Sequence, residues 1–508
     1  MRAKQPTWST RCSFEGSAER LHSTSLDFEA MPAASDRTRR TDAYVEVEQQ
    51  LLARWPETKL DPSLDRIAAL CHLLAEPQRA YPVIHLTGTN GKTSTARMID
   101  TLLRRLGLRT GRSTSPHVQS MTERISVDGS PLTRERFVEV YDEVVPYADV
   151  VDNSGGHPVS FFELITAMGF AAFADAPVDA GIIEVGMGGT WDATNVVNAS
   201  VAVVTPIGVD HAQYLGDTSG DIAIEKAGIV KAGTFAVLAQ QPLDAAEVLL
   251  RHAAEVGATV AREGLEFGVA ARRPGMGGQL LTLQGLGATY DDVFLPLYGA
   301  HQAQNAACAL AAVEAFAGGK GLDGGLDAEL VREAFGQVTS PGRLEVVRRS
   351  PTVLIDAAHN PHGARATAEA IQEAFTFSPL VGVCAVMADK DVEGLLDALE
   401  PVLSTIICTQ NSTPRSIQAE ELAEVARGIF GADRVEVVSR LDDAIERAVN
   451  LADAGQLEGH HAAFEGLSQE AWGSEEFESG SVGFGGGGVL VTGSVITAGE
   501  ARILLGGT

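Results

Sequence analysis

Apolar residues along this chain fall into two kinds of run, and the two kinds alternate. Short, largely apolar runs at Val83–Leu86, Ala180–Val185, Ser200–Thr205 and Ala236–Ala239 have the length and composition of buried strands. Between them, apolar residues recur every three or four positions, which is the period of a helix packed on one face. This alternation predicts a mostly parallel sheet covered by helices on both faces.

The same alternation restarts after Ser340-Pro341-Gly342-Arg343, where Pro and Gly interrupt both helix and strand, so we predict an inter-domain hinge there. Before the hinge, residues 255–298 predict a strand-rich excursion with glycine turns, and an alanine-rich helix then runs to Phe316. After the hinge, strands are predicted at Val353–Ile355, Val381–Val386, Ile406–Cys408, Val435–Val438 and Val489–Val491. Helices are predicted between them at Ala364–Phe375, Val392–Leu399, Ala419–Ile429 and Asp442–Leu451.

These elements predict an α/β protein with one domain at 42–340 and a C-terminal Rossmann-like α/β domain at 341–508. Residues 1–41 are rich in Ser, Thr and Arg and lack an apolar segment, so we expect a disordered extension, with Met31 as an alternative start. Residues 455–488 contain six Glu and no Lys or Arg among Gly and Ser. We predict that they form a flexible acidic, glycine-rich surface insertion.

The clearest candidate for a ligand-binding loop follows the strand that ends at Thr87. This strand runs into Gly88-Thr89-Asn90-Gly91-Lys92-Thr93 and then into a helix. Such a turn directs backbone N–H groups and the positive end of a helix dipole at one small volume, which suits phosphate. Lys92 would reach the terminal phosphates of ATP, and the Thr93 hydroxyl would face Mg²⁺. Leu86 stands where the usual P-loop has glycine, so the loop is a shortened variant; the alternative is a tight turn whose glycines serve only the backbone. We therefore predict an N-terminal P-loop ATPase-like domain.

The composition and net charge of the chain narrow the classes of molecule that it can bind. With 508 residues the chain can form two or three domains with full cores. Its formal net charge of −28 argues against nucleic-acid and anionic-membrane partners, since both need clustered Lys and Arg. No apolar run approaches the ~18 residues that span a bilayer. Five scattered cysteines without a CxxC pair indicate small core residues in a reducing cytoplasm.

Two polar residues follow predicted strands at the edge where ligands bind in open α/β sheets. Glu184 ends one strand and His211 lies just past another. With a hydroxyl from Thr93 or Ser115 they would form a Mg²⁺ site completed by water and phosphate oxygens. The alternative for His211 is a hydrogen-bonded loop histidine. For Lys226, the residues alone favour a surface pair with its neighbour Glu225.

Taken in order, the motifs resemble the folylpolyglutamate synthase / dihydrofolate synthase family within the Mur ligase superfamily, over residues 42–508. The departures are Thr190-Trp191 where Arg-Leu is usual, Ala357 where Gly is usual, and the insertion at 455–488. The motifs that carry the resemblance are Gly88–Thr93, Thr114-Ser115-Pro116-His117, Glu123-Arg124-Ile125, Glu184–Gly189, Asp192–Asn195, Gly208–His211, Leu215–Thr218, Glu225–Ile229, His301-Gln302, Asn305–Ala307, Pro341–Glu345 and Asp356–Pro361.

The resemblance implies a role for each candidate site residue. It implies that Lys226 is carbamylated, an anion that helps to position Mg²⁺; the reaction with CO₂ needs a neutral amine, so burial must lower the lysine's pKa. The implied catalytic residues are Lys92, Lys226 and His359; those on ATP are Gly88, Thr89, Asn90, Gly91, Lys92, Thr93, Asn305, Arg343 and Asp356. Those implied on Mg²⁺ are Ser115, Glu184 and His211, to which the loop pattern itself adds Thr93. Near the pterin it implies Phe161, Phe162, Asp192 and Ala193, with ordinary core packing as the alternative for both Phe residues.

The activity expected from residues and resemblance together is an ATP- and Mg²⁺-dependent ligase, cytoplasmic and monomeric. It would add L-glutamate to dihydropteroate, to reduced folates, or to both, through an acyl phosphate. One rival is a muramyl-peptide ligase acting on a UDP-sugar, against which Ser115-Pro116-His117 and Asp192–Asn195 speak. Another is a non-catalytic nucleotide-binding protein on the same scaffold, which the joint presence of Lys92, Glu184, His211 and Lys226 disfavours.

Overall fold

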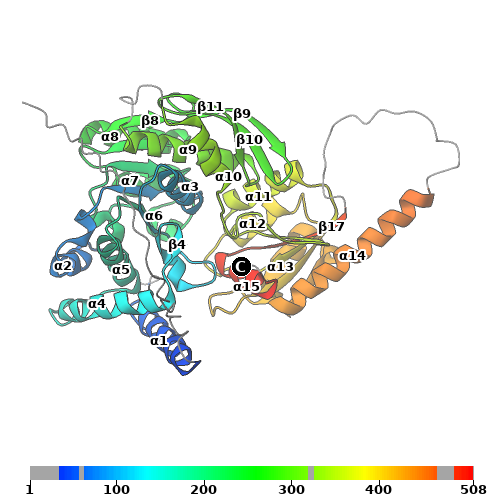
Figure 1. The fold of residues 1–508 in the computed structure, drawn as a ribbon. Coiled ribbons are helices and arrows are strands. Elements are labelled where there is room, and N and C mark those ends of the chain that lie inside the picture. The colour runs from blue at the N-terminus through cyan, green and yellow to red at the C-terminus, as the bar shows by residue number, and fades with distance from the viewer. Residues whose placement is uncertain (1–33, 57–61, 319–324, 466–485, 507–508) are drawn as a thin grey trace, which may run out of the picture.

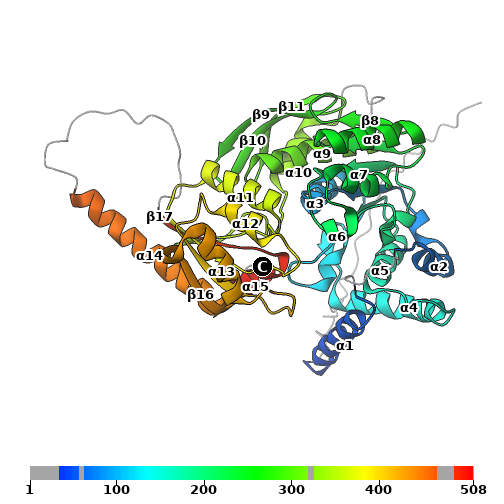
Figure 2. The ribbon, with the colours of Figure 1, turned by 180° about the vertical axis from the view of Figure 1, so that it is seen from behind.

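The computed structural model describes residues 34–56, 62–318, 325–465 and 486–506. The chain forms two α/β bodies that lie side by side, one built from residues up to 262 with two later helices and the other from residues 345–506 (Figures 1 and 2). A small three-stranded sheet contacts both bodies. The predicted fold class, α/β with mostly parallel sheets, is confirmed.

The first body is organised by an eight-stranded sheet. Its strands are β1 Val83–Thr87, β2 Thr110–Ser113, β3 Ile125–Val127, β4 Ser130–Pro131, β5 Ala180–Glu184, β6 Val201–Val204, β7 Phe235–Leu238 and β8 Thr259–Arg262. Their order is β4-β3-β2-β5-β1-β6-β7-β8, parallel except for β3 and β4, which pair antiparallel at one edge. The central strands β5, β1 and β6 are buried along their whole length. Burial on both faces is why these runs are continuously apolar.

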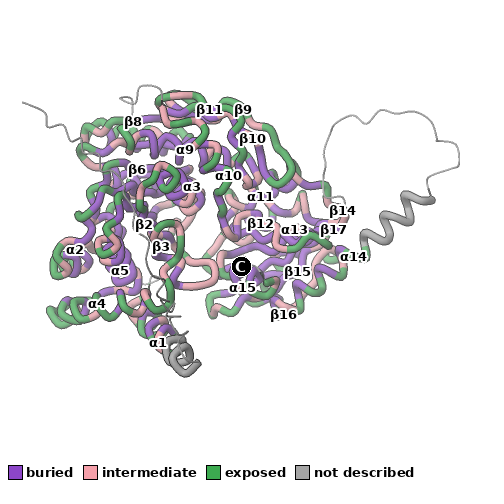
Figure 3. Tube along the Cα trace, in the orientation of Figure 1, coloured by how far each residue is buried: buried purple, intermediate pink, exposed green. Residues whose placement is uncertain are grey.

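Helices cover both faces of this sheet. They are α1 Ala34–Leu52, α2 Asp65–Leu73, α3 Lys92–Arg105, α4 Arg134–Asp152, α5 Phe161–Asp175, α6 Ala212–Leu215, α7 Ser219–Ala227, α8 Leu243–Val256, α9 Ala300–Phe316 and α10 Ala328–Gly336. One core holds residues of α3, α9 and α10, and a second holds residues of α1, α2, α4 and α5. In Figure 3 buried residues accordingly concentrate along the strands and the inner sides of the helices.

Capping accounts for where α5 begins. The Ser160 hydroxyl accepts from the backbone N–H of Glu163 at 3.2 Å, and the Glu163 carboxylate accepts from the N–H of Ser160 at 2.7 Å. This reciprocal pair satisfies two N–H groups that the first helical turn leaves without partners. Glu163 is therefore a capping residue of α5.

The predicted strand-rich excursion is an antiparallel sheet of three strands, β9 Gly268–Gly275, β10 Gly278–Gln284 and β11 Thr289–Leu295. Its apolar side packs into the core that holds α9 and α10. Arg272 on β9 also makes an ion pair with Glu373 of the second body. The sheet is therefore one of the contacts between the two bodies.

The second body contains a six-stranded sheet with the order β12-β13-β17-β14-β15-β16. The strands are β12 Glu345–Arg349, β13 Thr352–Ile355, β14 Phe377–Cys384, β15 Thr405–Gln410, β16 Val435–Arg440 and β17 Gly486–Thr492. All pairs are parallel except β12 with β13. Helices on its two faces bury separate cores; they are α11 Pro361–Ala374, α12 Val392–Leu399, α13 Ala419–Phe430, α14 Leu441–Glu465 and α15 Val495–Leu504.

The structure corrects the bounds of two predicted segments. Helix α1 begins at Ala34, inside the extension predicted for 1–41, and residues 1–33 lie outside the described part of the chain. The predicted insertion at 455–488 is wrong at both ends, because α14 continues to Glu465 and β17 begins at Gly486. The glycines that resemble a loop are required by packing: a Cβ on Gly487 would overlap the backbone of Ala452. The predicted flexibility of 466–485 lies outside the described residues.

This close approach of β17 to α14 defines a deletion whose outcome can be predicted. Gly487 packs directly against Ala452, so removing 456–485, which includes the last ten residues of α14, and joining the ends with a short Gly-Ser linker leaves β17 and the part of α14 that it contacts in place. We expect ligase turnover within about threefold of the full chain, since surface changes away from such packing have small effects. The measurement is steady-state kcat on both chains. A fall beyond tenfold with an unchanged melting temperature would show that the segment acts in turnover.

The length and apolar content of the helices in both bodies bear on membrane association. Among the helices in the described ranges, none combines the length and the apolar content that crossing a bilayer requires.

Candidate active site

A cavity of about 1300 Å³ lies between the two bodies. The first body contributes residues that follow β1, β5 and β6, and the second contributes the loops after β13 and β14. Carboxyl ends of neighbouring parallel strands form a crevice in open α/β sheets, and here two such edges face each other. The candidate residues that line it are Gly88, Thr89, Asn90, Gly91, Lys92, Thr93, Ser115, Glu184, His211, Lys226, Asn305, Arg343, Asp356 and His359.

The phosphate loop connects β1 to the first residue of α3. Gly88 has φ +146° and Gly91 has φ +88°, values that side chains other than glycine rarely adopt. A Cβ on Gly88 would also overlap the Thr205 hydroxyl, and one on Gly91 would overlap the Asn305 amide oxygen. These glycines therefore let the loop lie against its neighbours, and the N–H groups of Thr89 and Asn90 donate to the Pro206 carbonyl at 3.0 and 3.4 Å.

Two lysines from different elements meet at the loop. Lys92 donates to the carbonyl oxygens of Gly88 and Thr89 at 2.9 and 3.1 Å, and Lys226 on α7 donates to the same Gly88 oxygen at 2.8 Å. Burial lowers the pKa of Lys92, and burial together with the neighbouring Lys92 lowers the pKa of Lys226 to about 7. Lys226 is only 4% exposed, so it is not the surface partner of Glu225 that the residues alone favour.

Glu184, Thr93 and Ser115 form one hydrogen-bonded group. The Thr93 hydroxyl donates to both carboxylate oxygens of Glu184 at 2.9 and 3.0 Å, and the Ser115 N–H donates to one of them at 3.4 Å. Burial raises the pKa of Glu184, while the ammonium of Lys92 opposes that shift. Glu184 is the last residue of β5, next to β1, which explains why a residue 91 positions away meets the start of α3.

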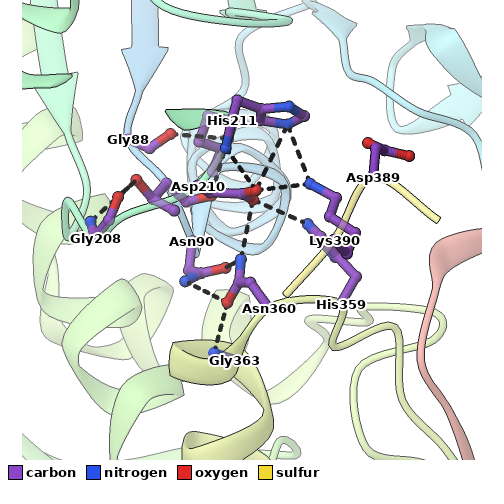
Figure 4. A network of polar contacts seen from close by, with 12 residues as sticks. Gly88, Asn90, Gly208, Asp210, His211, His359, Asn360, Gly363, Asp389 and Lys390 are labelled. Carbon is purple, nitrogen blue, oxygen red and sulfur yellow. Dashed lines mark hydrogen bonds and ion pairs between the residues drawn. The ribbon is translucent and has the colours of Figure 1, made fainter. Parts of the chain in front are cut away.

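His211 lies on the side of the cavity that faces the second body (Figure 4). It adopts φ +54° just before α6, and its Nε2 lies 3.3 Å from the Lys390 ammonium. Burial lowers the pKa of His211 to about 4, so the ring is neutral at pH 7 and its Nε2 can accept from the Lys390 ammonium. Lys92 is among the charges that act on His211, which places both residues around the same space.

Asp210 is a site residue that the sequence reasoning did not select, although it adjoins His211 in a quoted motif. Its Oδ1 accepts from Lys390 Nζ at 2.7 Å, and its Oδ2 accepts from Asn360 Nδ2 at 3.1 Å and lies 3.6 Å from His359 Nε2 (Figure 4). Burial acts to raise the pKa of Asp210, but His359 and Lys390 outweigh it and hold that pKa below its usual range. Asp210 thus contacts three side chains of the second body.

Lys390 and Asn360 are the other residues that the sequence reasoning missed as site residues. Asn360 also exchanges hydrogen bonds with Asn90 of the phosphate loop, at 3.2 and 3.4 Å. The available signal was weak: Lys390 stands between two Asp residues shortly after the predicted strand Val381–Val386, at a strand's carboxyl end. Its partner Asp210 is 180 positions away, and only the fold brings the two together.

The residues predicted to contact the nucleotide lie at the junction of the bodies. The Asn305 amide donates to Gln302 at 3.1 Å, and Arg343 donates to its neighbour Gly342 at 3.2 Å. Asp356 is held by the N–H groups of Leu344 and Ala358 at 2.8 Å each and by the Thr367 hydroxyl at 2.9 Å. Asp356 therefore also fixes the hinge that carries Arg343.

The four residues predicted near the pterin do not line the cavity. Phe161 and Ala193 belong to the core beneath α5, and Phe162 packs against Gly186. Asp192 accepts from the Met187 and Thr194 N–H groups at 2.9 and 3.0 Å and is 3% exposed. The core alternative describes Phe161 in this structure, and contact of the four with a pterin stays a prediction.

The donor set can be tested for a metal ion. Within the described ranges, no cluster of three or more His, Cys, Asp or Glu side chains could hold one. The grouped residues are Thr93 and Glu184, whose side-chain oxygens hydrogen-bond, and Ser115, whose N–H donates to Glu184; the neutral His211 lines the same cavity. A carboxylate with a hydroxyl beside it fits Mg²⁺, which keeps several waters and takes further oxygens from phosphates.

Comparison with known protein families gives the class of protein to which this chain belongs. Residues 160–313 match the Mur ligase middle domain, and residues 342–457 match the Mur ligase glutamate ligase domain. The two matches fall on either side of the hinge at Pro341-Gly342.

The chain is 50% identical over 477 residues to the dihydrofolate synthase/folylpolyglutamate synthase of Mycobacterium tuberculosis, covering 91% of this chain and 94% of that protein. It is 32% identical to the protein of the same name from Bacillus subtilis, over 75% and 89% of the two chains. The chain belongs to the dihydrofolate synthase/folylpolyglutamate synthase family, whose members are Mur-type ligases that form amide bonds. The predicted family and enzyme class are confirmed.

Solved structures agree with this assignment. The M. tuberculosis folylpolyglutamate synthase complexed with ADP aligns with a TM-score of 0.84 at 48% identity, over 92% of this chain and 99% of that one. Escherichia coli FolC in complex with DHPP and ADP aligns with a TM-score of 0.72 at 27% identity, over 92% and 97%.

Proposed function

We propose that this chain adds L-glutamate to dihydropteroate, to tetrahydrofolate and its polyglutamates, or to both, using ATP. The observation that supports the proposal most is the convergence of Lys92, Glu184 and Lys226 from three elements on one cavity that the second body closes. Nucleotide and DHPP bound to relatives of the same fold support the choice of ligands. We also propose a cytoplasmic monomer; the free, buried Cys71, Cys308, Cys384 and Cys408 fit a reducing compartment.

The reaction we propose has two steps. An oxygen of the substrate carboxylate bonds to the γ-phosphorus of ATP while the bond to the β,γ-bridging oxygen breaks, and its electron pair leaves on ADP. The glutamate nitrogen then bonds to the acyl carbon, and phosphate leaves with the C–O electron pair. The glutamate ammonium gives up two protons, one to the departing phosphate and one to solvent. Such transfer asks the protein mainly for positioning and charge neutralisation.

Each of the predicted site residues would help to position ATP, glutamate or the pterin substrate. Lys92 would turn from the Gly88 and Thr89 carbonyls to the β- and γ-phosphates. The loop amides would bind the phosphates beside it, those of Thr89 and Asn90 after leaving the Pro206 carbonyl. Asn305 and Asp356 would contact adenine and ribose, and Arg343 a phosphate, because all three line the cavity at the junction. His359 would lie near the incoming glutamate or the γ-phosphate. Phe161, Phe162, Asp192 and Ala193 would contact the pterin after a rearrangement that opens them to the cavity, which they do not line in this structure.

Mg²⁺ would be held by Thr93, Ser115, Glu184 and His211, where it would neutralise charge on the phosphate oxygens. Lys226 would support this site as a carbamate. Its pKa of about 7 leaves much of the amine neutral at physiological pH, as the addition of CO₂ requires. In that addition the nitrogen of the neutral amine bonds to carbon, one C–O π bond of CO₂ opens onto oxygen and the nitrogen releases one proton, so an anion replaces the neutral amine next to Lys92.

A substrate comparison tests the proposed function. Phosphate release would be measured with dihydropteroate, with tetrahydrofolate and with a UDP-muramoyl substrate, each with and without its amino acid. We expect glutamate-dependent release with at least one of the two pterins and none with the UDP-sugar. Release only with the UDP-sugar would favour a muramyl ligase, and ATP binding without any release would favour a non-catalytic protein.

The pKa of Lys226 gives a pH prediction. The neutral amine is the reactive form, so at fixed dissolved CO₂ the initial rate of carbamate formation should rise about tenfold from pH 6 to pH 8 and then level off. The rate would be followed as ¹³CO₂ incorporated into the full-length protein. A rise of roughly a hundredfold that continues above pH 8 is the behaviour of an ordinary lysine, and it would contradict a lowered pKa.

A further inference from the structure

Lys390 extends from the second body into the cavity beside His211. It lies in the turn after β14, immediately before Asp391, the N-cap of α12. Its ammonium donates to Asp210 Oδ1 at 2.7 Å and lies 3.3 Å from His211 Nε2 (Figure 4). The Lys390 and Asp210 side chains are only 9% and 10% exposed, so the contact is shielded from solvent.

The second body fixes where this ammonium lies. The N–H of Ala388 donates to the Arg415 carbonyl at 2.9 Å, and the N–H of Lys390 donates to the Met387 carbonyl at 3.1 Å. The neighbouring Asp389 pairs with the Arg415 guanidinium at 2.8 Å. The turn is therefore braced on both sides of Lys390, and the lysine enters the cavity when the second body docks on the first.

Holding the second body against the first does not by itself explain a lysine at this position. Asn360 and His359 already connect the second body to Asp210 through its other carboxylate oxygen. Lys390 additionally faces His211 and is one of the charges that act on Lys92, so two ammonium groups from different bodies flank one space. An ammonium has three donors, and with one on Asp210 and one toward His211 the third can reach an anion between the lysines.

We propose that Lys390 is a further catalytic residue, which contacts the phosphoryl group as it passes from ATP to the substrate carboxylate, with Asp210 as the residue that positions it. This inference rests on the proposed function. During the transfer a carboxylate oxygen bonds to phosphorus and the bridging oxygen leaves on ADP. Lys390 donates hydrogen bonds to the transferred oxygens and keeps its own proton throughout. Contact with the α-carboxylate of the incoming glutamate is the competing role, and the test below separates the two.

Hydroxylamine trapping isolates the first step. Without glutamate, hydroxylamine attacks the acyl phosphate and yields a hydroxamate, so hydroxamate and ADP report phosphoryl transfer alone. We expect Lys390→Gln to lower hydroxamate formation about a hundredfold, as for loss of one preorganised donor to developing charge. The KM for glutamate in the complete reaction should change less than threefold. Lys390→Arg, which keeps the charge, should retain at least a tenth of the wild-type rate.

Two further variants serve as controls. Arg415→Gln removes the ion pair that braces the same turn without touching the cavity, and we expect it to stay within about threefold of wild type. Asp210→Asn should lower hydroxamate formation about tenfold, and adding it to Lys390→Gln should cause little further loss, because the two residues act as a unit.

Three outcomes would overturn the assignment. Wild-type hydroxamate formation in Lys390→Gln with a raised KM for glutamate would make Lys390 a glutamate-binding residue. Equal losses in Lys390→Gln and Arg415→Gln would reduce it to a structural part of the turn. No hydroxamate from the wild-type chain with either pterin would instead refute the proposed function itself.

Discussion

Lys92→Ala is expected to remove at least ~3 kcal/mol of transition-state stabilisation, roughly a hundredfold or more in kcat/KM. The reason is its position: Lys92 is the first residue of α3, and its ammonium is held by the loop carbonyls at the point where phosphate would enter. Because Lys92 is partly buried, water can take over its charge only in part. The measurement is steady-state phosphate release with saturating glutamate.

Arg105→Ala is the matched control for Lys92→Ala. It removes a cation from the other end of the same helix, where Arg105 pairs weakly with Glu333 at 3.6 Å. We expect kcat/KM within about twofold of wild type for this variant. A thermal melt of both proteins checks that the fold is kept. Near-normal turnover of a folded Lys92→Ala variant would refute the phosphate-binding role of the loop.

Lys226→Ala is expected to lower kcat about a hundredfold, and small carboxylates such as formate or acetate should restore part of the activity. A carbamate presents its charge through a carboxylate-like group, and the truncated side chain leaves room for one beside Gly88. Activity would be measured at constant ionic strength, with chloride salts as the matched control. Wild-type activity of the Lys226→Ala variant would rule out a catalytic role for Lys226. Equal rescue by chloride would rule out a carbamate as the working group.

The sequence alone was sufficient for features that depend on local pattern. Strands β1, β5 and β6 are buried on both faces and therefore appear as continuous apolar runs. The phosphate loop is contained in six consecutive residues, so its glycines and Lys92 could be recognised together. Placing Glu184 near Thr93 needed only the rule that parallel strands share a carboxyl edge.

Features that depend on contacts between distant segments could not be predicted. Asp210 and Lys390 are ordinary charged residues until the second body docks on the first. The run Gly486–Gly488 is typical of a loop, yet it opens β17 because Ala452 and Phe377 leave no room for side chains. Phe161 has the same sequence signal whether it stacks on a ligand or packs in the core, and its neighbours decide.

The central claim is that one cavity between the two bodies activates a folate carboxylate as an acyl phosphate. Isotope transfer tests it most directly: the wild-type chain would convert dihydropteroate or tetrahydrofolate labelled with ¹⁸O in the reacting carboxylate, and the released phosphate would be analysed by mass spectrometry. The account predicts one ¹⁸O atom in each phosphate, because the carboxylate oxygen that attacks phosphorus leaves with it. Glutamate-dependent turnover that releases unlabelled phosphate would contradict it.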